Sequence, residues 1–185
     1  MSSGPQPSGS PSSSPRSSLE RFFRGLVESI FHGHLGVADV DLVDYLSDLL
    51  MRFLRTEALY GIRRETGRPA TEVVQMLCEA DRRIGLAKRE VHRHIGDFTL
   101  FWSGVYPESL RRLQSPHRPD GFLDYCDQGK RAYRIASEIE PDRENTPSDL
   151  LVRLSEQFEM CAFGFREIRR QWEEGDDPNS DQLLV

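Results

Sequence analysis

The densest apolar segment of the chain, residues 90–113, constrains the fold more than any other stretch. Its main apolar stripe consists of Val91, Ile95, Phe98, Trp102 and Val105. These residues are spaced by three and four, which is the spacing of one face of an α-helix. Leu100 and Phe101 add apolar surface outside this stripe, and a helix that is apolar on several sides is usually buried on several sides. This segment is therefore predicted to be the central helix, ending before Pro107.

Three polar residues lie along one flank of this predicted helix: Glu90, His94 and Asp97. At about 100° per residue their side chains follow the same line. One interpretation is that Asp97 is a buried structural carboxylate paired with an Arg, Tyr or His of a neighbouring helix. The alternative is that the three residues bind a transition metal ion or cofactor, because carboxylates in unusual environments gather at functional sites.

The sequence contains no complete catalytic motif. Ser103-Gly104 resembles part of a nucleophile elbow, but that motif requires Gly-x-Ser-x-Gly between a strand and a helix. Phosphate-binding patterns of the Gly-x-x-x-x-Gly-Lys and Gly-x-Gly-x-x-Gly types are also absent. We therefore lean towards a non-catalytic protein without a cofactor and leave an enzymatic role open.

Apolar residues at helical spacing predict about six helices, and no strand pattern competes with them. A short helix over Glu108–Leu113 follows the central one. The last helix carries the most regular seam, from Leu151 to Trp172. The predicted starts are Leu19, Asp39, Thr71, the residue after Gly85, Asp120 and Thr146-Pro147. The expected fold is an all-α, single-domain helical bundle.

The two ends of the chain differ in composition from this domain. Residues 1–18 contain fifteen Ser, Gly or Pro residues. Residues 173–185 contain five acidic residues and no basic one. Such segments bury too little apolar surface to offset the entropy of ordering. We expect a disordered tail at 1–18, a helical domain at 19–172 and an acidic disordered tail at 173–185.

Charge and cysteine content limit the classes of partner. The net charge of −6 comes mostly from the acidic tail, so the domain surface is nearly balanced and predicts no nucleic-acid binding. No apolar run approaches the length of about 20 residues that spans a bilayer. Cys78, Cys126 and Cys161 are odd in number and far apart, which is typical of core thiols in a reducing cytoplasm.

The segment HIGDFTLFWSGVYPESLRR resembles part of a family of uncharacterised bacterial all-helical proteins with a Gly-Asp-x-x-Leu-Phe-x-Ser-Gly pattern. In that family, as here, a tyrosine-bearing helix follows (DYCDQGKRAYRIAS). The resemblance covers about Leu86 to Trp172, with Pro107 where the family pattern has a small or acidic residue. It implies a helical fold and no assigned activity.

Two functions follow from these observations as hypotheses. The first is a non-catalytic helical protein-interaction module with an unidentified partner, and the Leu151–Trp172 seam is also compatible with a homodimer. The second is a metal- or cofactor-binding helical bundle that uses Glu90, His94 and Asp97.

Overall fold

A computed structural model of the chain describes residues 15–55, 72–113, 120, 123–142 and 145–175. Within these ranges the protein contains eight α-helices, one π-helical segment and no strand, which confirms the predicted all-α class. The elements are α1 Pro15–Glu28, η1 Ser29–His34, α2 Val40–Leu54, α3 Val73–Asp81, α4 Gly85–Val105, α5 Pro107–Leu113, α6 Tyr125–Glu138, α7 Ser148–Glu156 and α8 Phe158–Gly175.

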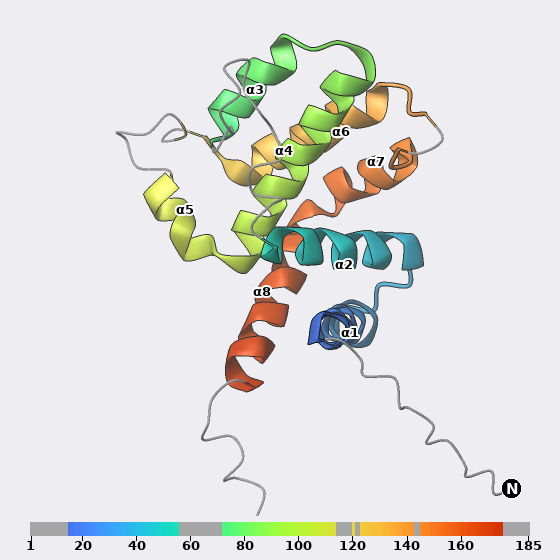
Figure 1. Cartoon of the computed structure of the whole chain (residues 1–185), viewed down its shortest axis with the longest axis vertical. Coiled ribbons are helices and arrows are strands. Elements are labelled where there is room, and N and C mark those ends of the chain that lie inside the picture. The colour runs from blue at the N-terminus through green and yellow to red at the C-terminus, as the bar shows by residue number, and fades with distance from the viewer. Residues whose placement is uncertain (1–14, 56–71, 114–119, 121–122, 143–144, 176–185) are drawn as a thin grey trace, which may run out of the picture.

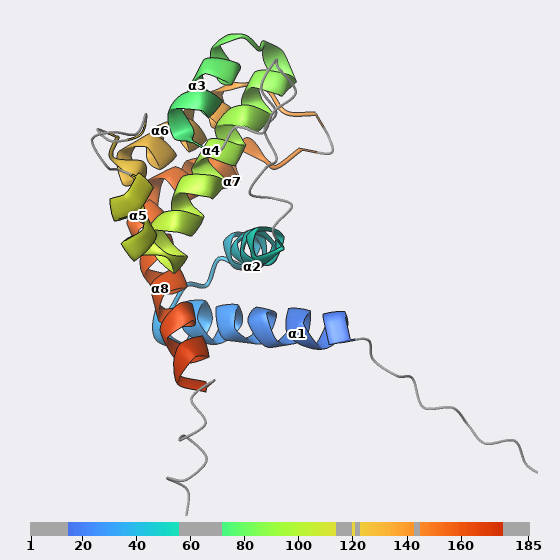
Figure 2. The ribbon, with the colours of Figure 1, turned by 60° about the vertical axis from the view of Figure 1, so that its left-hand side comes forward.

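The predicted central helix is α4. It packs against α2, α3, α5, α6 and α8, and it runs through the middle of the molecule (Figure 1). Val91, Ile95 and Leu100 are fully buried, and so is the polar Asp97. The helices α1 and α2 cross below α4: Figure 1 looks along α1 and across α2, and Figure 2 looks across α1 and along α2.

Two glycines let helices approach α4 closely. A Cβ on Gly104 would lie 2.5 Å from the Cβ of Phe165 in α8. A Cβ on Gly129 of α6 would collide with Phe158 and with the hydroxyl of Thr99. Gly104 thus allows α8, and Gly129 allows α6, to lie close against the central helix.

The last predicted helix is divided in two. α7 ends at Glu156 and α8 begins at Phe158, with Gln157 between them, and the chain changes direction there (Figure 1). The apolar spacing runs through the break without a change, so periodicity alone does not reveal it. The seam residues from Leu151 to Ile168 are buried within the chain itself.

Several helix ends differ from the predictions. α1 begins at Pro15 rather than Leu19, and α8 continues to Gly175, beyond Trp172. α6 begins at Tyr125, because Asp120 is used elsewhere: its carboxylate accepts from Val73 N (2.8 Å) and Val74 N (2.9 Å) and so caps α3. α2 ends at Leu54, and its C-cap Arg55 has extended backbone angles. The predicted cap Thr71 and the two predicted tails outside residues 15–175 lie outside the described residues.

The cysteine prediction was only partly right. Cys161 is buried, Cys126 is half-buried and Cys78 is exposed. In α3 the buried stripe is Val73, Met76 and Ala80. Cys78, two residues after Met76, falls on the opposite side of that short helix.

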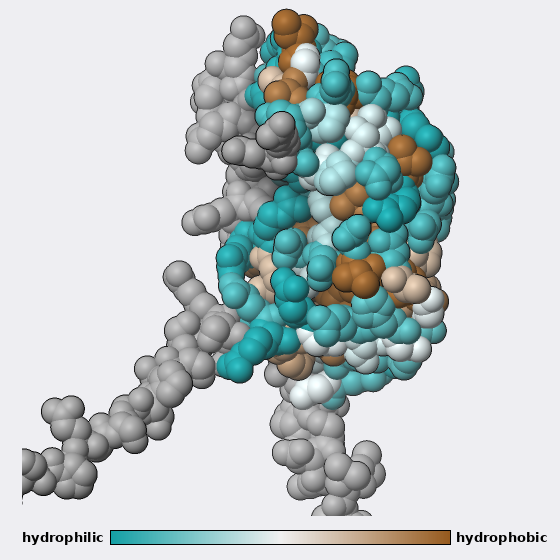
Figure 3. Space-filling view, turned by 90° about the vertical axis from the view of Figure 1, so that its right-hand side faces the viewer, coloured by the Kyte–Doolittle hydropathy of each residue, from teal (hydrophilic) through white to brown (hydrophobic). Residues whose placement is uncertain are grey.

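On the face in Figure 3 hydrophilic residues predominate, and apolar residues form small separate patches. Among the helices of the described ranges, none combines the length and apolar character needed to cross a lipid bilayer.

Candidate functional site

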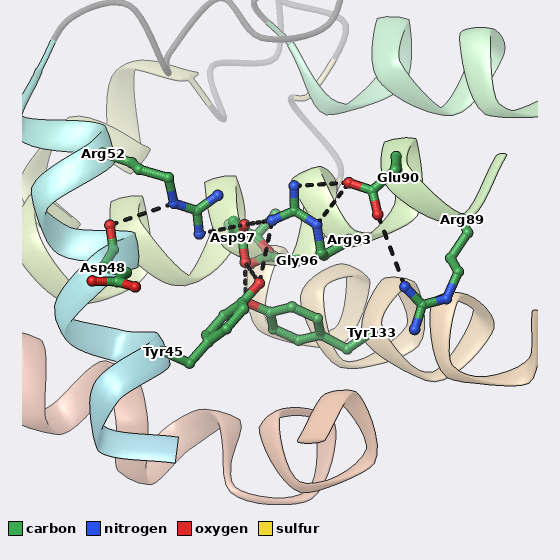
Figure 4. Close-up of polar contacts among 10 residues, drawn as sticks. Tyr45, Asp48, Arg52, Arg89, Glu90, Arg93, Gly96, Asp97 and Tyr133 are labelled. Atoms are coloured by element: carbon green, nitrogen blue, oxygen red, sulfur yellow. Dashed lines mark hydrogen bonds and ion pairs between the residues drawn. The ribbon is translucent and has the colours of Figure 1, made fainter. Parts of the chain in front are cut away.

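The carboxylate of Asp97 on α4 is fully buried and accepts hydrogen bonds from four side chains (Figure 4). Oδ1 accepts from the hydroxyls of Tyr45 (2.7 Å) and Tyr133 (2.8 Å). Oδ2 accepts from Arg93 Nη1 (2.6 Å) and Arg52 Nη2 (3.2 Å). These partners come from α2, α4 and α6. The paired structural carboxylate, the first interpretation of Asp97, is what the structure contains.

The local sequence of α4 explains part of this arrangement. Arg93 lies one turn before Asp97, so its guanidinium reaches the carboxylate along the helix. Glu90 lies one turn before Arg93 and accepts from Arg93 Nε at 3.0 Å. Gly96 provides space for Tyr133: a Cβ at this position would lie 2.6 Å from the tyrosine ring. Residues 90–97 of α4 therefore supply the ion pairs from Glu90 through Arg93 to Asp97. They also supply, at Gly96, the space in which Tyr133 of α6 packs.

Positive charge is in slight excess in this cluster. Two carboxylates, Glu90 and Asp97, face the guanidiniums of Arg52 and Arg93, and Arg89 lies 3.8 Å from Glu90. Burial, and then the negative charge of Asp97, raises the pKa of the Tyr45 and Tyr133 phenols. Both tyrosines therefore remain protonated and donate to Asp97, which is the arrangement that stabilises a buried ion pair.

The three residues of the metal hypothesis are not brought to one point. Glu90 and Asp97 are connected through Arg93. His94 instead stacks on Phe53, with ring centroids 5.8 Å apart, and its Nε2 is buried without a hydrogen-bond partner. Burial lowers the pKa of His94 to about 4. Across the described ranges, no group of three or more His, Cys, Asp or Glu side chains is placed to hold a metal ion.

A pocket of about 750 Å³ lies over the Asp97 cluster, between α1, α2, α4 and residues 145–146. Its lining includes five arginines and three acids, so it carries an excess of positive charge. Besides Tyr45, the only large apolar side chain of its lining is Met51. We call it the arginine pocket, after Arg21, Arg24, Arg52, Arg55 and Arg93.

The arginines of this pocket differ in how firmly they are held. Arg93 is only 17% exposed and is bound on both sides by acids. Arg24 is 51% exposed and pairs with Asp44 (3.5 Å) and Asp48 (3.4 Å). Arg55 is 59% exposed and pairs with Glu20. Exposed pairs of this kind contribute only about 0–1 kcal/mol, so Arg24 and Arg55 can exchange their partners at low cost.

Sequence reasoning missed the arginine pocket. Asp48, Arg52 and Arg55 share one face of α2 at spacings of four and three, which is a readable signal of a charged helix face. That this face meets Arg24 of α1 and Arg93 of α4 depends on how the helices cross, which the spacing does not give.

No family model, no curated protein and no solved structure matches the chain.

Proposed function

We propose that this protein is a non-catalytic interaction module that binds an acidic segment of a partner protein in the arginine pocket. The observation that carries the proposal is the convergence of five arginines from three helices on one pocket of about 750 Å³. Arg24 and Arg55 are the contact residues, because their present partners are weakly held surface acids. Arg52 and Arg93, which also bind Asp97, form the floor of the arginine pocket.

The lining of the pocket favours a protein segment over a small organic ligand. Small-molecule sites are mostly apolar with a few polar groups. In this pocket charged side chains dominate, as at the polar part of an interface. Glu or Asp side chains of a partner would replace Asp44, Asp48 and Glu20 at the exposed guanidiniums.

The proposal includes a cytoplasmic location, which the three free cysteines support. The partner is a different protein in this proposal. The seam compatible with a homodimer is buried inside the chain from Leu151 to Ile168, which favours a different protein as the partner. The metal alternative receives no support from the positions of Glu90, His94 and Asp97, because the Asp97 oxygens are already occupied by four donors.

The test is a binding titration of the full chain with a fluorescent oligoglutamate peptide, followed by anisotropy, with oligoglutamine as the neutral control. We expect binding of oligoglutamate that weakens as salt is added. The double variant Arg24→Ala/Arg55→Ala should bind about tenfold more weakly, since two charge-assisted contacts are lost.

Arg170→Ala is the matched control. Arg170 is 51% exposed, as is Arg24, and it pairs with Glu167 and Glu174 on α8 outside the pocket. This variant should bind like the wild type. No binding by the wild type, or an equal loss in Arg170→Ala, would contradict the proposal.

A further inference from the structure

A second pocket of about 330 Å³ lies where one face of each of three helices, α3, α4 and α6, meets. α3 contributes Leu77 and Asp81, one turn apart. α4 contributes Lys88 and His92, also one turn apart. The remaining wall is a face of α6. Figures 1 and 2 show α3, α4 and α6 side by side in this region. We call it the His92 pocket.

His92 is the unusual group of this pocket. Its side chain is only 4% exposed, and its Nδ1 is buried with no hydrogen-bond partner. His92 lines the pocket, and Nε2 is its other ring nitrogen. Burial lowers the pKa of His92, so its ring is neutral at pH 7 and offers either a donor or an acceptor.

Two cations and one acid, Asp81, line this space, and the cations are in excess. Lys88 on α4 and Arg131 on α6 line the pocket, and neither forms an ion pair with another described residue. This differs from the arginine pocket, where Arg24 and Arg55 are paired with acids. The His92 pocket therefore has unused positive charge.

The rest of the lining is suited to a small molecule. Leu77, Ala132 and Ile135 provide an apolar wall, and Gln128 adds a side-chain amide. A few convergent polar groups on an apolar wall, in a volume near the lower end of about 300–1,000 Å³, are typical of small-ligand sites.

We propose that the His92 pocket binds a small organic anion, a carboxylate or phosphate compound, with its anionic group between Lys88 and Arg131. A second polar group of the ligand makes a hydrogen bond with His92 Nε2, and its apolar part contacts Leu77 and Ile135. This site is independent of the arginine pocket, and neither binding event requires the other.

The test is a titration of the ¹⁵N-labelled full chain, followed by amide chemical shifts, with inorganic phosphate, acetate, butyrate and benzoate in separate arms. We expect saturable shifts that cluster on α3, α4 and α6. A response to carboxylates alone identifies the ligand as a carboxylate, and a response to phosphate alone identifies it as a phosphate compound. No saturable shift on these helices with any of the four probes would overturn the proposal.

Variants then assign the contacts. Lys88→Ala/Arg131→Ala should weaken binding by at least about tenfold, because hydrogen bonds to charged groups are among the strongest. His92→Phe keeps a ring in the wall and should weaken binding about threefold or more through the lost hydrogen bond. Asp81→Asn removes a negative charge from the pocket and should strengthen the binding of simple anions.

Arg134→Ala is the matched control, because Arg134 is an exposed arginine of α6 that pairs with Glu156 rather than lining the pocket. It should bind as the wild type does. Wild-type affinity in the Lys88/Arg131 double variant would overturn the proposal, even if His92→Phe fails to fold.

Discussion

At the scale of single residues, Asp97 shows what a sequence can and cannot predict. Its burial and its need for Arg or Tyr partners followed from a lone carboxylate in an apolar helix. The contact with Arg93 could also be read from the spacing of four. The partners Tyr45 and Tyr133 lie 52 and 36 residues away, and no local rule selects them. The contact between Arg52 and Asp97 could not be predicted for the same reason, because Arg52 lies on the polar face of α2.

Asp97→Asn should destabilise the protein by roughly 3–5 kcal/mol, because removing one partner of a buried ion pair leaves an uncompensated charge. Tyr133→Phe, which removes one of four donors, should cost roughly 1–3 kcal/mol. Urea denaturation followed by circular dichroism measures both. Asp48→Asn is the control: Asp48 is 68% exposed and pairs with Arg24, so its loss should cost under about 0.5 kcal/mol.

The metal hypothesis makes a different prediction for the same proteins. If Glu90, His94 and Asp97 bound a metal ion, a chelator would lower the melting temperature of the wild type. With Asp97 held by two tyrosines and two arginines, we expect no change on chelation. Stoichiometric metal in the native protein, lost in all three single alanine variants, would contradict this.

His94 should make stability depend on pH. Burial lowers its pKa from the ordinary 6.5 to about 4, so between these values the unfolded chain binds a proton that the folded chain does not. Stability contributed by the neutral ring is therefore complete above pH 6.5 and is lost as pH falls towards 4, on the order of a few kcal/mol.

His94→Phe keeps an aromatic ring beside Phe53 and removes the titration. The difference in unfolding free energy between wild type and variant should therefore change between pH 6.5 and 4 and be constant above that window. A difference that stays constant throughout would show that His94 is not the titrating group.

At the scale of helices, apolar spacing predicted the elements well and their ends less well. The central helix α4 and the buried seam of α7 and α8 were visible as stripes. The break at Gln157 was not, because the apolar residues keep their spacing across it. The start of α6 was misplaced because Asp120, a good capping residue, caps α3 across space instead of the helix that follows it.

Gly96→Ala tests the close contact between α4 and α6. Alanine favours a helix over glycine by about 1 kcal/mol. Against this, the new Cβ would lie 2.6 Å from ring atoms of the fully buried Tyr133, and overpacking costs about 1–3 kcal/mol. The ring cannot move without straining its bond to Asp97, so we expect net destabilisation of about 1–2 kcal/mol.

Gly25→Ala on α1 is the matched comparison, because a Cβ there meets nothing within 4 Å. It should stabilise the protein by up to about 1 kcal/mol. Thermal and urea unfolding of the two variants should thus shift in opposite directions. A shift of both variants in the stabilising direction would mean that Tyr133 adjusts without cost.

At the scale of the whole molecule, the fold separates two kinds of polar group. Exposed ion pairs line the helices α1 and α8, where each contributes little. Buried polar groups join helices that are distant in sequence: Asp97 connects α2, α4 and α6, and Asp120 connects α3 to the start of α6. Three of the residues in contact with Asp97, namely Tyr45, Arg52 and Arg93, also line the arginine pocket. The contacts of Asp97 and Asp120 cannot be predicted from composition or net charge.

Arg89 is the buried group that ties the connection between α6 and α7 to the central helix. Its side chain is fully buried, with Nε donating to Ile139 O (3.0 Å) and Nη2 to Thr146 O (2.6 Å). Its Nη1 lies 3.8 Å from Glu90 Oε1, an ion-pair distance too long for a hydrogen bond. Burial lowers the pKa of Arg89, but a guanidinium remains charged at any physiological pH.

Arg89→Met should therefore destabilise the whole molecule rather than one helix. The methionine fills much of the volume but removes the donor from two partly buried carbonyl groups, which should cost up to roughly 1–3 kcal/mol each. Because α4 packs against α6, whose connection to α7 holds these carbonyls, we expect one cooperative urea transition with a lower midpoint and an unchanged slope. Arg134→Ala, which removes only an exposed pair with Glu156, should leave the midpoint within about 0.5 kcal/mol of the wild type. If Arg89→Met instead keeps its midpoint and becomes sensitive to proteolysis between α6 and α7 alone, Arg89 holds that connection only locally and not the bundle.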